Sequence, residues 1–220
     1  LLSESRYTVM EADEFDRSFL HLSPLISVVT AIDPDHLDIY GTADSMVEAY
    51  GEFCQRVRPG GTLILNEKIA SLLSLPNDAT IYTYGTGDGA SFRATTIRKE
   101  EGSYTFDIST PDGMVKDVRL RIPGLVNILN STAAAAAAWC AGVTPDDIRE
   151  ALWSYEGVRR RFDIRYAGSE ITYVDDYAHH PAEINALVSA VRDFWPGKHV
   201  TGVFQPHLYS RTRDFAEGFA

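Results

Sequence analysis

The stretch ISVVTAI, residues 26–32, is a continuous run of mostly apolar, β-favouring residues. A second run of this kind, TLILN at residues 62–66, follows a segment from Gly41 to Val57 whose apolar residues recur at helical spacing. Strands of a parallel sheet have such uninterrupted apolar runs because helices cover both faces of the sheet. A strand, a helix and a strand in this order therefore predict a parallel α/β sheet.

The pattern changes after this unit. Between Ile81 and Ile122, short alternating segments are separated by turn residues, which predicts antiparallel hairpins appended to the sheet. The glycine-rich stretch GTGDG at 85–89 is interpreted as one of these turns, because no Lys follows it as in a phosphate-binding loop. Helices are expected over 128–141 and 144–155.

A new α/β pattern starts after Gly157. We expect a strand at 171–174, a helix at 181–194, a strand at 199–204 and a helix from about residue 211. A further short strand is expected at 7–11. We place a domain boundary near 157–160, so that residues 1–158 form one domain and residues 159–220 begin a second.

Composition limits the classes of function. The chain has 220 residues with 31 acidic and 20 basic side chains, a net charge of −11, which disfavours binding to nucleic acid. No apolar run approaches the roughly 18 residues of a membrane span. Cys54 and Cys140 have no paired spacing, and we expect free thiols in a reducing cytoplasm.

Two acidic segments follow expected strands. The first, EADEFD at 11–16, includes Glu11, and the second, DHLD at 35–38, includes His36. Carboxylates at the carboxyl ends of parallel strands suit Mg²⁺ that carries substrate phosphates. A solvated acidic loop and a surface salt bridge are the alternative interpretations of these two segments.

Three more polar segments lie in the second half. DDYAHHP at 175–181 lies between a strand and a helix, which favours a functional role, and a zinc site is conceivable there without a supporting motif. FQPHLYSRT at 204–212 contains Arg211, which could bind a carboxylate, or Ser210 could simply cap a helix. RRR at 159–161 could neutralise a phosphoryl group or be solvated.

These segments occur in one order and together resemble motifs of the Mur ligase family. The matching stretches are EADE at 11–14, DHLD at 35–38, Asn127 with Asn130, Gly157 to Phe162, DDYAHHP at 175–181, and FQPH with YSRT at 204–212. Val126 and Leu208 depart from the family pattern, which has His and Arg there. The resemblance implies an ATPase-type central domain that is mostly parallel α/β, followed by the start of a Rossmann-like α/β domain.

The resemblance also implies an activity. It indicates a bacterial cytoplasmic ligase of peptidoglycan precursor synthesis that uses ATP and Mg²⁺ to join L-alanine to UDP-N-acetylmuramate through an acyl phosphate. It implies the following roles: Glu11 and His36 as metal ligands; Asn127 and Asn130 at the adenine; Arg161 and Asp176 at the phosphate and ribose; and Tyr177, His179, His207 and Arg211 at the amino acid. Glu11, His36, Arg161 and His179 are the catalytic candidates, with His179 a possible general base.

The chain begins Leu1-Leu2-Ser3 and has no Gly-Lys-Ser/Thr sequence, so we expect part of a longer protein that is inactive by itself. Other readings stay open at this point. A sibling ligase would attach a peptide instead of free alanine, a non-catalytic module would bind nucleotide without turnover, and a metallohydrolase would hold zinc tightly.

Overall fold

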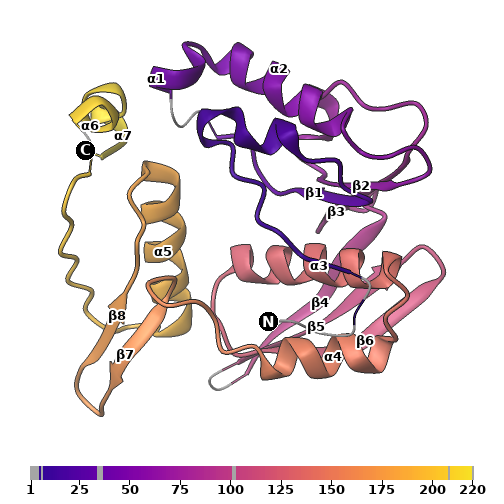
Figure 1. Ribbon diagram of the computed structural model, residues 1–220. Coiled ribbons are helices and arrows are strands. Elements are labelled where there is room, and N and C mark those ends of the chain that lie inside the picture. The colour runs from indigo at the N-terminus through magenta and orange to yellow at the C-terminus, as the bar shows by residue number, and fades with distance from the viewer. Residues whose placement is uncertain (1–4, 6, 34–36, 101–102, 208, 220) are drawn as a thin grey trace.

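The computed structural model describes residues 5, 7–33, 37–100, 103–207 and 209–219. Six neighbouring strands form one sheet in sequence order (Figure 1). They are β1 (Ile26–Val29), β2 (Thr62–Asn66), β3 (Thr80–Gly85), β4 (Phe92–Glu100), β5 (Ser103–Thr110) and β6 (Gly113–Leu120). Pairing is parallel from β1 to β4 and antiparallel from β4 to β6, which confirms the predicted α/β class.

Strand β2 lies at the centre of a three-layer arrangement. Leu63 and Leu65 are fully buried in a cluster with η1 (Phe15–His21) and α2 (Ala43–Cys54). Ile64, pointing the other way, is fully buried against α3 (Leu125–Cys140). Figure 1 shows α2 and α3 on opposite sides of the parallel strands. The uninterrupted apolar run therefore has the cause expected from the sequence, burial on both faces.

Capping residues fix the helix starts. Thr42 accepts a hydrogen bond from the Ser45 N–H at the start of α2, and Thr144 accepts one from Asp147 at the start of α4 (Pro145–Ser154). Pro181 opens α5 (Pro181–Phe194), where its missing N–H costs no helical bond. The short helices are α1 (Leu37–Tyr40), η2 (Ala70–Leu72), α6 (Tyr209–Asp214) and α7 (Ala216–Phe219). No helix among the described residues is long and apolar enough to cross a bilayer.

The last third of the chain packs on the antiparallel strands. Strands β7 (Asp163–Ala167) and β8 (Thr172–Asp175) form an antiparallel pair, and α5 follows them. Ala190 of α5 and Phe162 share a buried cluster with Phe106 of β5. The Tyr104 hydroxyl donates to the Asp193 carboxylate, so burial and this acceptor raise the pKa of Tyr104 to about 12. The apolar core is thus continuous from β5 to α5.

Two expected strands are absent from the described residues. Residues 7–14 have no strand partner, and Val9 in this segment is 97% exposed. Residues 199–204 are likewise unpaired, and Val203 is 99% exposed. A β-favouring sequence forms a ladder only where a neighbouring strand receives its N–H and C=O groups. Strand β7 was not anticipated: it has only five residues, most of them exposed, and it lacks a continuous apolar run like that of β2.

The glycine-rich stretch does not join a hairpin, so that expectation was wrong. Strands β3 and β4 are parallel, and Tyr84 lies opposite Phe92. The Glu67 carboxylate accepts the N–H groups of Thr86 and Gly87, both at 2.9 Å. An added Cβ at Gly85 would lie 2.1 Å from a Glu67 oxygen, which explains why glycine suits this position.

Replacement of Leu63 by Ala should test the central role of β2. Its side chain is fully buried, so we expect a loss of about 2–5 kcal/mol in the free energy of unfolding, measured with urea. Leu72→Ala is the matched control, because Leu72 is 56% exposed and its loss should cost about 0.5 kcal/mol or less. Equal effects of the two substitutions would contradict the assignment of Leu63 to the core.

Candidate functional site

The segment that connects the sheet to β7 has an unusual backbone. Gly157, Arg160 and Phe162 all have positive φ, at 92°, 63° and 47°. An added Cβ at Gly157 would come 2.9 Å from Ile122, so glycine fits here for space as well as for φ. The two non-glycine residues carry strain of the kind that persists only where surrounding contacts fix the backbone.

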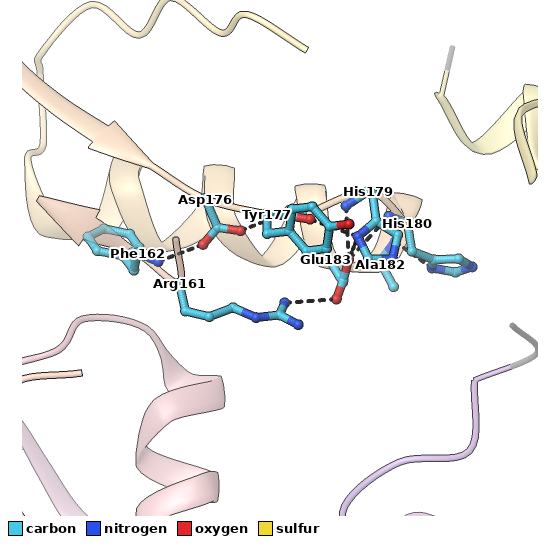
Figure 2. Close-up of polar contacts among 9 residues, drawn as sticks. Arg161, Phe162, Asp176, Tyr177, His179, His180, Ala182 and Glu183 are labelled. Atoms are coloured by element: carbon cyan, nitrogen blue, oxygen red, sulfur yellow. Dashed lines mark hydrogen bonds and ion pairs between the residues drawn. The ribbon is translucent and has the colours of Figure 1, made fainter. Parts of the chain in front are cut away.

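Asp176 and Tyr177 supply those contacts. One carboxylate oxygen accepts the Phe162 N–H at 2.7 Å, and the other accepts the Ala178 N–H at 2.7 Å. The Tyr177 N–H donates to the Arg160 carbonyl, also at 2.7 Å. Figure 2 shows Asp176, which directly follows β8, beside Phe162 of the loop before β7. The structure therefore brings the predicted residues Arg161, Asp176 and Tyr177 into one cluster.

Glu183 joins the same cluster from the first turn of α5. One of its oxygens accepts the N–H groups of His179 at 2.9 Å and His180 at 3.2 Å, and the other binds the Arg161 guanidinium at 3.1 Å. Burial by itself would raise the pKa of Glu183, but the His179 N–H, Arg161 and His180 together hold this pKa below its usual value. Glu183 is therefore an anion with its hydrogen-bonding capacity largely used.

The hydrogen bond of His179 fixes the proton on its ring. Its Nδ1 lies 2.8 Å from the Tyr177 carbonyl, which can only accept, so Nδ1 carries the hydrogen. In the neutral ring Nε2 then has a free lone pair, as a general base requires. His180 has the opposite tautomer, because its Nδ1 accepts the Ala182 N–H. The arrangement thus favours His179 over His180 as a proton acceptor.

A cavity of about 370 Å³ lies beside this cluster. Its charged lining residues are three arginines and two acids, Arg121, Arg159, Arg161, Glu156 and Asp163, and its apolar lining includes Ile122 and Phe162. Arginine side chains beside apolar ones suit a ligand with both phosphate and an aromatic ring.

The two predicted adenine ligands lie on α3. The Asn127 side chain donates to the Pro123 carbonyl at 2.7 Å, and Asn127 is half-buried. Asn130 lies one turn later and is exposed. Pro123 lines the cavity, so Asn127 is linked to the cavity wall by this bond.

The metal-binding prediction can be followed only in part. Glu11 is exposed in a segment without a strand, and His36 lies outside the described residues. The Tyr40 hydroxyl of α1 donates to the Glu14 carbonyl at 2.6 Å, which brings the acidic segment beside the helix that begins at Leu37. Among the described residues no three His, Cys, Asp or Glu side chains form a metal-binding group.

The residues predicted to bind the substrate amino acid do not all lie in the cluster. Tyr177 is 40% exposed, and the Arg160 guanidinium lies 4.5 Å from its ring centre. His207 is exposed in the segment before α6. Arg211 belongs to α6, and its side chain lies outside the described part of the structure.

Glu183 was missed by the motif search. The available signal was its place three residues after the helix N-cap, where Glu completes a capping box. The signal was weak because the N-cap residue is His180, which is not among the usual caps.

Models of two domains from one protein family match the two parts of the chain. The model of the Mur ligase middle domain matches residues 1–138, and that of the Mur ligase, glutamate ligase domain, matches residues 160–220. The UDP-N-acetylmuramate–L-alanine ligase of Parabacteroides distasonis is 46% identical over 220 residues, which is 100% of this chain and 48% of that protein. The Cytophaga hutchinsonii ligase of the same name is 45% identical, covering 97% and 46%.

Solved structures have the same fold. A MurF ligase from Acinetobacter baumannii matches with a TM-score of 0.69 at 26% identity, covering 79% of this chain and 39% of that one. The UDP-N-acetylmuramate-alanine ligase of Thermotoga maritima matches with a TM-score of 0.73 at 24% identity, covering 90% and 45%. This chain thus spans about half the length of the relatives from P. distasonis and C. hutchinsonii. Since the middle-domain model alone matches residues 1–138, the chain belongs to the Mur ligase family.

Proposed function

We propose that this chain is the central domain and the beginning of the C-terminal domain of an ATP-dependent ligase that joins L-alanine to UDP-N-acetylmuramate. The observation that carries the proposal is Arg161, which lines a cavity together with two further arginines and is held at the junction of the two matched domains. The relative from P. distasonis, whose name states this reaction, supports the choice of substrates through its 46% identity over the whole chain.

The cavity and its arginines are suited to the nucleotide. A guanidinium has five N–H donors, and Arg161 uses one of them on Glu183, so donors remain for a phosphate. Asn127 and Asn130 would bind the adenine, and Asp176 the ribose. Glu11 offers a carboxylate, the ligand type that Mg²⁺ prefers, and His36 is the second proposed ligand. Bound Mg²⁺ would neutralise phosphate charge.

The chemistry proceeds in two steps. The muramyl carboxylate takes the terminal phosphoryl group of ATP and becomes an acyl phosphate, with ADP leaving. The L-alanine amine then attacks the acyl carbon, a proton leaves the nitrogen, and phosphate departs as the amide forms. Arg161 would offset the negative charge in both steps. The neutral form of His179, in which Nε2 is the acceptor, would take the proton.

The substrate amino acid would lie on the side of the cluster away from the nucleotide. We assign Arg211 to its carboxylate and place Tyr177, His179 and His207 around it. We set the boundary between the ATP-binding and amino-acid-binding domains at residues 158 and 159, inside the strained segment. The free thiols Cys54 and Cys140 fit a reducing bacterial cytoplasm.

Phosphate release by the full-length protein should test the function. With UDP-N-acetylmuramate and ATP, we expect turnover with L-alanine and none with a tripeptide. Turnover with only the tripeptide would indicate the peptide-attaching sibling instead. ATP binding without turnover would indicate the non-catalytic module.

Arg211→Ala in the full-length protein should raise the KM for L-alanine by roughly tenfold to a hundredfold, the loss of a charged carboxylate contact. Arg149→Ala is the matched control, since Arg149 lies on the surface of α4 and pairs with Asp146 of the same helix. An unchanged KM for L-alanine in Arg211→Ala would rule out the assignment.

The 220-residue chain alone should show no ligation, because it contains no Gly-Lys-Ser/Thr sequence to hold the ATP phosphates. The measurement is amide product by mass spectrometry after incubation with both substrates, ATP and Mg²⁺. Formation of the amide product by this chain in the presence of ATP would contradict this prediction.

Asp176→Asn should loosen the junction, because the amide keeps one acceptor oxygen where the carboxylate uses two. We expect the amide hydrogens of Phe162 or Ala178 to exchange roughly tenfold faster with solvent, equivalent to about 1–2 kcal/mol. Asp112→Asn, in the turn between β5 and β6, is the control for the same chemical change. Unchanged exchange at both amides would show that Asp176 does not hold the loops.

A further inference from the structure

The two carboxylate oxygens of Glu183 have different partners. Oε2 accepts the backbone N–H groups of His179 and His180, at 2.9 Å and 3.2 Å. Oε1 accepts from Nη1 of Arg161, at 3.1 Å (Figure 2). One side chain therefore connects the loop before α5 with a residue 22 positions earlier in the chain.

These partners are two groups with proposed functions. His179 is the proposed proton acceptor, and its own Nδ1 lies 3.7 Å from Oε2 of Glu183. Arg161 is the proposed phosphate ligand, and its side chain is 55% exposed, so little packing restrains it. A long, exposed guanidinium without a partner samples many rotamers, and an ion pair reduces that freedom.

We propose that Glu183 is a positioning residue of the ligase reaction, which aims the Arg161 guanidinium at the nucleotide while it holds the backbone of His179 in place. This inference rests on the proposed function. Glu183 does not touch substrate itself. It accepts one of the five N–H donors of Arg161 and leaves the others for a phosphate.

Glu183→Gln separates this role from simple helix capping. Glutamine completes a capping box as glutamate does, so its single oxygen can keep the N–H groups of His179 and His180. Its NH₂ group then faces Arg161, where two donors meet and the ion pair is lost. Glu183→Ala removes both functions. Asp146→Asn is the matched control, because it breaks the ion pair with Arg149 on the surface of α4.

The first measurement uses the full-length protein. For Glu183→Gln we expect the KM for ATP to rise roughly threefold to tenfold, with the KM for L-alanine changed by less than about twofold. Glu183→Ala should also lower kcat, because the backbone of His179 is released. Asp146→Asn should match the wild type. An unchanged KM for ATP in an active Glu183→Gln protein would overturn the inference.

The second measurement does not require activity. In the 220-residue chain we expect Glu183→Gln to keep slow amide exchange at His179 and His180 and to increase the mobility of the Arg161 side chain, observed by its Nε–H resonance. Glu183→Ala should lose both. If Glu183→Gln leaves Arg161 unchanged, the inference fails. If the full-length wild type does not ligate while these resonances behave as expected, the proposed function fails, and with it the role in catalysis, but the contact itself is supported.

Discussion

Two backbone hydrogen bonds to one carboxylate hold the candidate site in its observed arrangement. Asp176 accepts the Phe162 N–H from the loop before β7 and the Ala178 N–H from the loop after β8. The positive φ of Phe162 costs on the order of 1–3 kcal/mol, and a hydrogen bond to a charged acceptor contributes about as much. Because these two loops carry Arg161 and His179, the positions of both follow from the Asp176 contacts.

A few of the acidic side chains bind groups of the protein itself. The net charge is −11, yet several carboxylates at the site face backbone N–H groups or arginine instead of solvent. Glu183 is an example. Burial would raise its pKa, but the donors from His179, Arg161 and His180 hold this pKa below its usual value. Three arginines line the cavity against two acidic residues, whereas acidic residues outnumber basic ones in the protein as a whole. Local charge, more than net charge, is what a phosphate would encounter at short range.

The elements of the fold that could be predicted were those specified by residues close together in the sequence. The helix at 181–194 begins at Pro181 and ends as predicted, because its start and its apolar period are both local signals. The strand at 7–11 was wrong, because pairing depends on a neighbour that the pattern does not show. The contact between Arg161 and Glu183 joins residues 22 positions apart through folding, and no spacing rule indicates it. Motif order did indicate that Arg161 and Asp176 belong to one site, and both contribute to the cluster.

The glycine-rich loop after β3 binds a carboxylate from another part of the same chain. The amides of Thr86 and Gly87 point at a carboxylate, as the amides of a nucleotide-binding loop point at phosphate oxygens. Here the negative group is Glu67, tethered just after β2, and the glycines let it come close. An outside anion would have to compete with a ligand at very high effective concentration. The two N–H groups are therefore already occupied by Glu67, and their hydrogen bonds connect the end of β2 to the loop after β3.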